Sequence, residues 1–359
     1  MAGALAVDPA GIFTLAWAEG NTILAVRSTA GGAWSSPATV LAAGGASNGR
    51  SLAFDASGSG WAVWPSSATS PSCGSVSGAR FVPGTGWSAA RVLSADPSFG
   101  AVAAKIVVAS SGAGTLVLSG NDCSSGAPGS TGPVESASLD TAGNVTGTVE
   151  LLNGSFSTPN FALAGNSAGD AHAAIVSYGY FVDGAFGTSM VLSKHAGSAW
   201  SLPFTLLSNS LGFNFPPVVA RVAAAPTSGG AIAVSAAANG PPVGPGERLL
   251  QFAQFSAGAW PSSPSFVRPE APDVLNPAID VALDDLGRAT LLRSEVSDLS
   301  QSQQVLLARL VPGFGWTPDV ALSNSGPVEG QIRVALDRDG HGLAVWINRD
   351  GSVSARRFQ

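Results

Sequence analysis

Asp55-Ala-Ser-Gly58-Ser-Gly-Trp-Ala-Val-Trp64 joins a four-residue turn to a short apolar run that ends in tryptophan. The same arrangement recurs from Asp8 through Gly11 to Trp17, and from Asp337 through Gly340 to Trp346. Weaker copies close on Gly112, Gly169, Gly229 and Gly287. From one turn glycine to the next the chain runs 47, 54, 57, 60, 58 and 53 residues. A period in this range indicates repeated units that share one core.

A second turn, Gly-x-Trp or Gly-x-x-Trp, occurs once in most units and leads into another apolar segment. Its tryptophans are Trp34, Trp87, Trp200, Trp260 and Trp316, and Val145 takes the position in the third unit. Between turns the residues run apolar or alternate over five to seven positions, which is a strand pattern and not a helical one. In the sixth unit this predicts four antiparallel strands, at 279–283, 289–292, 304–310 and 316–322.

Four-stranded sheets repeated four to eight times are the blades of a β-propeller. We therefore predict an all-β, seven-bladed β-propeller that forms a single domain over residues 1–359. The expected blades are approximately 1–46, 47–99, 100–156, 157–213, 214–271, 272–327 and 328–359. Composition agrees, because charged residues make up only 11% against a usual share of about 25%. Glycine and proline, 45 and 24 residues, supply the many turns that short strands need.

The last unit stops at Ser354-Ala-Arg-Arg-Phe358, which we take as the third strand of its blade. The fourth strand, the one that contains tryptophan, is missing from both ends of the given sequence. Either the seventh blade is three-stranded with an open edge, which exposes unpaired backbone groups, or the chain is cut from a longer polypeptide. We favour the second interpretation.

The charge pattern argues against two classes of partner. The net charge is −6, and no basic cluster exceeds Arg356-Arg357, whereas nucleic-acid binding needs a concentrated basic face. No apolar run reaches the 18 residues of a membrane span, and no charged-then-apolar leader follows Met1. We expect no nucleic-acid partner, no membrane span, no signal peptide within this chain, and a monomer.

Ser28-Thr-Ala-Gly-Gly-Ala-Trp34 resembles the aspartate-box turn of sialidase-like propellers, Ser-x-Asp-x-Gly-x-Thr-Trp. The aspartate is absent and the spacing is one residue short, so the turn is a degenerate form. The resemblance extends over the whole chain through the repeated Gly-x-x-Trp turns and supports the propeller fold.

A sialidase-like site would imply three arginines on a substrate carboxylate, a tyrosine nucleophile paired with a glutamate, and an acid/base residue. Arginine suits a carboxylate because its planar fork bonds both oxygens. Arg50, Arg221 and Arg333 begin the innermost strands, where they could face the channel mouth, and Lys105 and Asp280 are nearby in the pattern.

The rest of the sialidase-like set is missing. The two tyrosines, Tyr178 and Tyr180, have no glutamate in their loop, and the Arg-Ile-Pro segment of that family is absent. The alternative to a site is that these charged residues are solvated at the ends of strands.

Aromatic residues suggest a second kind of ligand site. Trp64 and Trp346 could stack on a sugar, with Arg293 at the same position in the sixth unit, although packing between blades explains them more economically. The long loops of units four and five add Tyr178, Tyr180 and further aromatic residues. The tentative ligand-binding set is Arg50, Arg221, Arg333, Tyr178, Tyr180, Arg293, Trp64 and Trp346.

The pattern predicts no catalytic residues, metal or cofactor. His172, His195 and His341 fall in different units, so their spacing assembles no metal cluster. Asp337-Arg-Asp-Gly-His-Gly342 resembles the start of a calcium loop but lacks the remaining ligands. An aspartate that begins such a turn more often accepts hydrogen bonds from its own backbone, and glycine supplies the left-handed conformation.

Cys73 and Cys123 lie in corresponding loops of units two and three. Neighbouring blades would bring these loops to one face, so we expect a disulfide and a secreted, bacterial protein. Two unrelated thiols are the alternative.

These observations predict an extracellular, non-catalytic binding or interaction module, lectin-like if its ligand is a glycan, with a protein ligand as the other option. The alternative is a sialidase-like glycoside hydrolase that uses the channel-mouth arginines. A third interpretation is a structural repeat module of a larger surface protein.

Overall fold

The computed structural model is all-β: every regular element among the described residues is a strand. The structure describes residues 4–8, 10–19, 22–28, 33–42, 51–66, 74–94, 99–122, 131–152, 160–181, 184–194, 197, 199–211, 219–238, 248–269, 278–296, 303–323, 328–337, 339–348 and 350–359. In that part of the chain no helix is long and apolar enough to cross a membrane.

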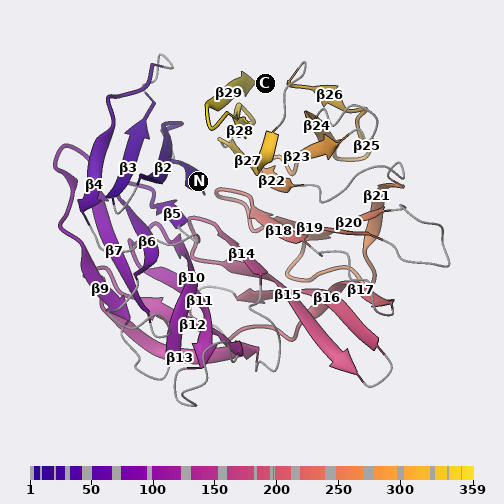
Figure 1. Cartoon of the computed structure of the whole chain (residues 1–359), viewed down its shortest axis with the longest axis horizontal. Coiled ribbons are helices and arrows are strands. Elements are labelled where there is room, and N and C mark those ends of the chain that lie inside the picture. The colour runs from indigo at the N-terminus through magenta and orange to yellow at the C-terminus, as the bar shows by residue number, and fades with distance from the viewer. Residues whose placement is uncertain are drawn as a thin grey trace. The chain divides into compact units, whose positions relative to one another are not determined.

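Seven antiparallel sheets follow one another along the chain, and the last has three strands (Figure 1). This arrangement confirms the predicted seven-bladed β-propeller with an incomplete last blade. The chain divides into two compact units, Met1–Pro159 with Gly165–Ala171, and Asn160–Ala164 with His172–Gln359.

The first unit holds three sheets in strand order along the chain. The first sheet comprises β1 (Ala4–Val7), β2 (Phe13–Glu19), β3 (Thr22–Arg27) and β4 (Ala38–Ala42). The second comprises β5 (Ser51–Phe54), β6 (Gly60–Ser66), β7 (Ser75–Val82), β8 (Gly86–Trp87) and β9 (Arg91–Ser94). The third comprises β10 (Phe99–Val108), β11 (Gly114–Asp122), β12 (Thr131–Leu139) and β13 (Val145–Leu152).

The fourth sheet contains the division between the units, and the last three sheets belong to the second unit. The fourth sheet comprises β14 (Asn160–Gly165), β15 (Ala171–Phe181), β16 (Gly184–Lys194) and β17 (Phe204–Leu211). The fifth comprises β18 (Val219–Ala224), β19 (Ala231–Ala238), β20 (Arg248–Phe255) and β21 (Ser265–Pro269). The sixth comprises β22 (Ile279–Leu283), β23 (Ala289–Val296), β24 (Gln303–Val311), β25 (Gly315–Trp316) and β26 (Val320–Ala321). The seventh comprises β27 (Val328–Leu336), β28 (Gly342–Asn348) and β29 (Val353–Phe358).

The Asp-x-x-Gly turns connect the first two strands of a sheet, and their aspartates organise the backbone. Asp8 Oδ1 accepts the backbone N–H groups of Ala10 and Ile12, both at 3.0 Å. Gly11 donates its N–H to the carbonyl of Asp8 at 2.9 Å and has φ of 74°, a left-handed conformation that glycine adopts without steric cost. The same hydrogen bonds recur at Asp55, Asp284 and Asp337. The prediction that these aspartates accept hydrogen bonds from their own backbone is confirmed.

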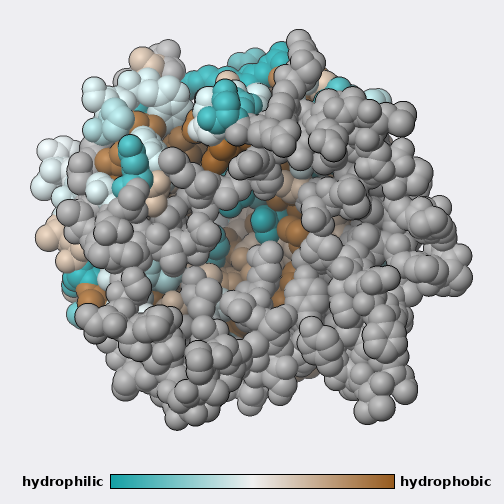
Figure 2. Space-filling model, in the orientation of Figure 1, coloured by the Kyte–Doolittle hydropathy of each residue, from teal (hydrophilic) through white to brown (hydrophobic). Residues whose placement is uncertain are grey.

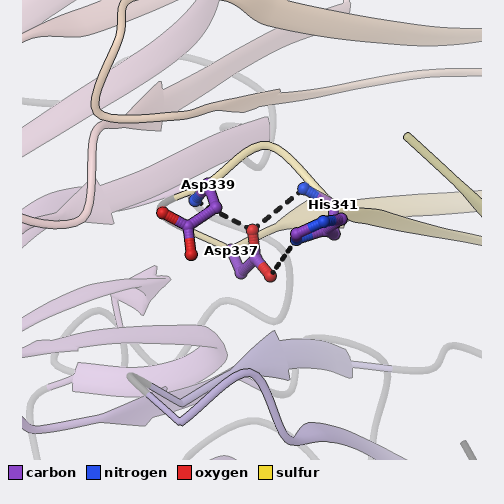
Figure 3. Close-up of side chains that lie close together, drawn as sticks. All are labelled: Asp337, Asp339 and His341. Atoms are coloured by element: carbon purple, nitrogen blue, oxygen red, sulfur yellow. Dashed lines mark hydrogen bonds and ion pairs between the residues drawn. The ribbon is translucent and has the colours of Figure 1, made fainter.

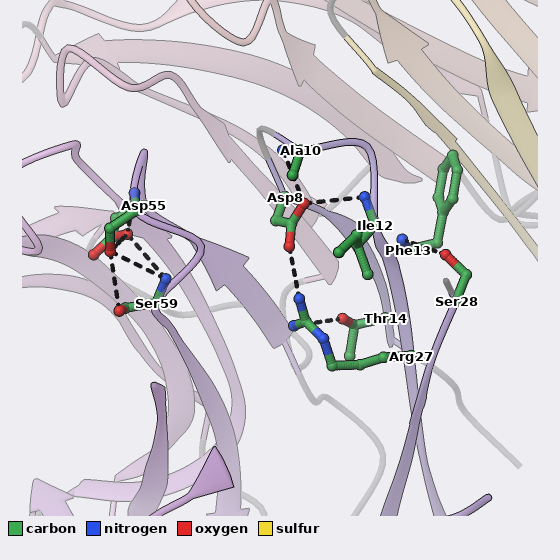
Figure 4. A network of polar contacts seen from close by, with 10 residues as sticks. Asp8, Ala10, Ile12, Phe13, Thr14, Arg27, Ser28, Asp55 and Ser59 are labelled. Atoms are coloured by element: carbon green, nitrogen blue, oxygen red, sulfur yellow. Dashed lines mark hydrogen bonds and ion pairs between the residues drawn. The ribbon is translucent and has the colours of Figure 1, made fainter. Parts of the chain in front are cut away.

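The first of these turns is also held by Arg27 of the same sheet (Figure 4), and Arg27 contacts the neighbouring sheet as well. Arg27 Nη2 donates to Asp8 Oδ2 at 2.6 Å, and Nη1 donates to Thr14 Oγ1 at 3.1 Å. The same guanidinium lies 4.3 Å from the ring centre of Phe81 and 5.0 Å from that of Phe54, both in the second sheet. Arg27 therefore links the first two sheets through one ion pair and two cation–π contacts.

Replacing Asp8 with alanine is expected to lower the free energy of unfolding by about 2–4 kcal/mol, because it removes the turn hydrogen bonds and one partner of a largely buried ion pair. Urea unfolding followed by circular dichroism measures this loss. Asp140→Ala is the matched control, since Asp140 caps an exposed turn through Asn144. A loss for Asp8→Ala no larger than the control's would contradict the role assigned to the Arg27 contact.

A hydroxyl that follows tryptophan fixes the start of the fourth strand in several sheets. Thr317 donates its backbone N–H to the carbonyl of Arg309 at 2.7 Å, and its Oγ1 accepts the Arg309 N–H at 3.0 Å. Ser35, Ser88 and Ser201 make the same pair of bonds to Arg27, Arg80 and Ser193. The Trp-Ser or Trp-Thr step thus sets the register of these strands.

Apolar residues from facing strands form the core of each unit. In the first unit Trp64 is fully buried and packs with Ile23 and Leu52. In the second, Ile232 and Leu291 belong to one buried cluster. Figure 2 shows teal and white residues along the upper edge of this view, with brown apolar residues visible among and beneath them. A core of this kind follows from strands whose apolar residues recur on one or both faces.

Candidate functional site

Three charged side chains gather on the first strands of the last three sheets. Arg221 lies on β18, Asp280 on β22 and Arg333 on β27. These strands lie next to one another within the second unit. The pairing register explains the gathering: the partners are Val234, Leu292 and Val345, each the fifth residue after its turn glycine. The three side chains therefore occupy one equivalent position in consecutive sheets.

Asp280 connects the other two strands. Its Oδ2 accepts the backbone N–H of Val334 at 2.9 Å, and its Oδ1 lies 3.8 Å from Arg221 Nε. Arg221 Nη1 donates to the carbonyl of Ala220 at 2.9 Å, and Arg333 Nη1 donates to that of Ile332 at 2.7 Å. Each guanidinium therefore folds back onto its own strand, and the hydrogen bond to Val334 fixes the carboxylate.

The site has more positive than negative charge. The Arg221 side chain is 22% exposed and that of Asp280 15%, so water screens their charges only partly. The pKa of Arg221 is lowered to about 10, because burial and the charge of Arg333 lower it by more than Asp280 raises it. Arg221 is still protonated at neutral pH. Two guanidinium groups next to one carboxylate leave a net charge near +1, which an anionic ligand would neutralise.

The first unit uses the equivalent position differently. Ser51 and Lys105 pair with Val63 and Val117, again the fifth residue after the turn glycine. Ser51 Oγ accepts the backbone N–H of Ile106 at 3.2 Å, as Asp280 accepts that of Val334. The position thus bonds the backbone of the next first strand in both units, and only the second unit adds two arginines to it among the described residues.

The other tentative ligand residues that the structure describes lie mainly in the core. Trp64 and Trp346 are 0% and 6% exposed and belong to apolar clusters, so neither ring offers a free face for stacking on a sugar. Arg293 is 9% exposed, and its Nη2 donates to Asp319 Oδ2 at 2.8 Å. These three residues stabilise their sheets.

The remaining predicted residues are placed only in part. Tyr178 and Tyr180 belong to β15, but their side chains are outside what the structure describes. Arg50, Cys73 and Cys123 lie outside the described residues, as does His195. Of the three predicted arginines, Arg221 and Arg333 therefore lie in the site that the structure describes, and Arg50 stays a prediction.

Asp337, Asp339 and His341 are a candidate group for holding a cation, since one ligand atom from each lies within 4.8 Å of the others (Figure 3). Both carboxylate oxygens of Asp337 already accept protein hydrogen bonds. Oδ1 accepts the backbone N–H groups of Asp339 and His341, and Oδ2 lies 3.0 Å from His341 Nδ1. The group is fully explained as a turn.

His172 is buried and structural rather than a surface ligand. Its Nδ1 lies 2.7 Å from Ser193 Oγ, which also accepts the Trp260 indole N–H at 2.9 Å. The ring packs edge-on against Phe255 and Trp260. The three predicted histidines thus serve different local structures where they are described.

Comparisons with known proteins show the fold. No family model and no curated protein matches the chain. An ulvan lyase described as a new polysaccharide lyase family, PL25, and bound to -[GlcA(1-4)Rha3S]-, matches with a TM-score of 0.66 and 10% identity, over 99% of this chain and 90% of its own. An α-L-arabinanase of Penicillium chrysogenum, complexed with arabinobiose, matches at 0.51 and 15% identity, over 86% and 92%. The polysaccharide lyase Uly1 matches at 0.50 and 11% identity, over 89% and 77%.

These findings correct one sequence-based expectation. We expected a protein without catalysis, yet the matched proteins of this fold include polysaccharide lyases and an arabinanase, which are enzymes. The expectation rested on a missing tyrosine–glutamate pair, which only sialidase-like chemistry requires. The coarser resemblance, to glycan-active β-propellers, is shown, whereas membership of the sialidase-like group stays a prediction.

Proposed function

We propose that this protein is a polysaccharide-degrading enzyme that binds an acidic sugar residue through Arg221 and Arg333. The observation on which the proposal depends is the charge arrangement: two partly buried guanidinium groups influence each other, and only one of them, Arg221, has a carboxylate partner, Asp280. Two like charges held close together repel each other unless an anion lies between or beside them. A sugar carboxylate supplies that anion and matches the planar fork of arginine.

The fold gives independent support for a glycan substrate. The matched lyases and the arabinanase act on polysaccharides by their descriptions, and one is bound to a chain that contains GlcA. Identities of 10–15% show the fold alone, so we derive the reaction from this chain's own residues.

The arginine pair suits elimination at a uronate. Neutralising the sugar carboxylate makes the hydrogen on the adjacent carbon more acidic, because the negative charge that develops in the transition state falls on the same carboxylate group. A base accepts that proton, the electrons of the C–H bond form a double bond to the next ring carbon, and the bond from that carbon to the leaving sugar oxygen breaks. The leaving oxygen takes up a proton from water and departs as a hydroxyl group. Arg221 and Arg333 would stabilise the developing charge, and Asp280 would hold Arg221 in place.

An activity screen tests this proposal. The protein is incubated with uronate-containing polysaccharides and with the same polymers after reduction of their carboxyl groups. We expect ultraviolet-absorbing unsaturated products and new reducing ends from the native polymers only. New reducing ends without ultraviolet absorbance would show that the enzyme hydrolyses its substrate and does not eliminate. Binding without cleavage, or equal cleavage of the reduced polymers, would contradict the proposal.

We also propose an extracellular location with a Cys73–Cys123 disulfide, which rests on the sequence alone. Intact mass after alkylation without reduction is expected to show no added alkyl groups, and reduction should allow both cysteines to react. Alkylation of both without reduction would contradict the disulfide.

A further inference from the structure

The first strand of each sheet has an inner edge, the edge that faces away from the second strand of that sheet. In an antiparallel pair, residues that bond across the pair alternate with residues whose N–H and carbonyl point away from it. In the seventh sheet the Asp337 N–H donates to the carbonyl of His341 at 2.9 Å, so Asp337 and every second residue before it bond to β28. Val334, three positions before Asp337, therefore directs its N–H to the inner edge.

Two inner-edge N–H groups bond to a side chain of the preceding sheet. Val334 on β27 donates to Asp280 Oδ2 at 2.9 Å, and Ile106 on β10 donates to Ser51 Oγ at 3.2 Å. Each donor lies three positions before the first residue of its turn, and each acceptor lies four positions before the first residue of its own. A hydroxyl or carboxylate oxygen on one first strand therefore accepts the inner-edge N–H of the next.

The fourth and fifth sheets have the same two positions but lack the acceptor. Ala162 lies four positions before Asn166, where the fourth turn begins, and Val222 lies three positions before Ala225, where the fifth begins. Both belong to the second unit, and Ala162 packs against the apolar cluster that contains Val222. The side chain of Ala162 ends at a methyl group, so it supplies no oxygen. Among the described residues no other side chain accepts the Val222 N–H.

Arg221 directly precedes Val222, so a guanidinium lies beside this N–H. Its Nη1 donates to the carbonyl of Ala220, which points to the same edge as the Val222 N–H because the two residues are two positions apart. Ala220 and Val222 pack with the fourth sheet, whereas Ala223 packs with the sixth. An oxygen bonded to the Val222 N–H therefore lies close to Arg221 and to the fourth sheet. A sugar hydroxyl accepts such a bond as a serine hydroxyl does.

We propose that Ala162 and the Val222 N–H form a subsite for the sugar next to the acidic one, in which a hydroxyl oxygen of an uncharged sugar accepts the Val222 N–H. The inference rests on the proposed function, since Arg221 and Arg333 hold the acidic sugar beside this subsite. The small side chain of Ala162 makes the subsite specific for a ligand oxygen. A serine or aspartate here would bond the N–H from within the protein, as in the second and sixth sheets, and would compete with the sugar.

Two probes separate this subsite from the arginine pair: glucuronate alone, and a hyaluronan tetrasaccharide, in which GlcA alternates with an uncharged sugar. Isothermal titration calorimetry measures the binding of each to the whole protein. We expect the tetrasaccharide to bind about tenfold more tightly than glucuronate, and Ala162→Ser to reduce this preference about 5- to 10-fold, because its hydroxyl takes the Val222 N–H. Ala164→Ser adds the same hydroxyl two positions further along β14 and should leave both affinities unchanged.

A second measurement uses the wild type, so that it does not depend on how the variant folds. In protein labelled with ¹⁵N-valine, the Val222 amide resonance, identified by its loss in Val222→Ile, should shift with the tetrasaccharide and not with glucuronate. An unmoved resonance at saturation, or equal tetrasaccharide affinities of wild type and Ala162→Ser, would overturn the subsite and leave the proposed function standing. Absence of binding by both probes would overturn the arginine site and the subsite together.

Discussion

Replacing Arg333 with alanine is expected to lower kcat/KM on an acidic polysaccharide by about 10- to 100-fold, the loss of a hydrogen bond to a charged group. The same change at Arg221 should cost at least as much, because it also leaves Asp280 without its partner. Among the described residues Arg333 has no carboxylate partner within ion-pair distance, so its removal frees no buried charge. The loss should therefore appear in activity and leave the unfolding midpoint nearly unchanged.

Two further variants and a modified substrate test this expectation more closely. Arg333→Lys keeps the charge but not the fork, so it should recover only part of the activity. Lys194→Ala removes a cation from β16, outside the site, and should leave kcat/KM unchanged. Cleavage of the carboxyl-reduced polymer, if measurable, should be equally slow for the wild type and Arg333→Ala. An undiminished kcat/KM for Arg333→Ala would exclude the arginine pair from catalysis.

Truncation of Trp64 to alanine should cause the largest loss of stability in the chain's first unit, about 3–5 kcal/mol. The ring is fully buried against residues of the first two sheets, so its removal leaves a cavity that rigid strands cannot refill. Urea unfolding gives the change in free energy, provided that the two compact units unfold together.

Two variants show whether packing is the cause. Trp34 is 38% exposed, so Trp34→Ala should cost much less. The Trp64 indole N–H is buried without a hydrogen-bond partner among the described residues, so Trp64→Phe loses volume but no hydrogen bond and should retain most of the stability. A Trp64→Phe loss as large as that of Trp64→Ala would point to an unseen polar contact instead.

The fold was predictable because the same turn motifs recur along the sequence. Aspartate and glycine recur at fixed positions of the first turn, and tryptophan with serine or threonine recurs at the second, so each sheet can be counted from the chain. These turns act locally, through hydrogen bonds within about four residues, and local rules need no knowledge of distant contacts.

The site was predictable only in part, because it depends on register between strands of different sheets. The fifth residue after each turn glycine pairs with Arg221, Asp280 or Arg333. Counting from the glycines would therefore have predicted that these three residues occupy equivalent positions. The ion pair between Arg293 and Asp319 could not be predicted in this way. The two residues are 26 positions apart and meet across β24, and no sequence motif connects them. The burial of Trp64 and Trp346 was the more economical of two interpretations, since their rings suit packing as well as sugar stacking.

The equivalent position on each first strand has a consequence for how such a protein can acquire new specificities. It is occupied by Ser51, Lys105, Arg221, Asp280 and Arg333 in five sheets, each of which has a glycine-containing turn between its first two strands. Mutation at this position changes the ligand chemistry without touching the folding signals, which lie elsewhere in each repeat. Single substitutions after gene duplication therefore change ligand binding one repeat at a time. A laboratory library randomised at these five codons would produce the same kinds of variant without changing the scaffold.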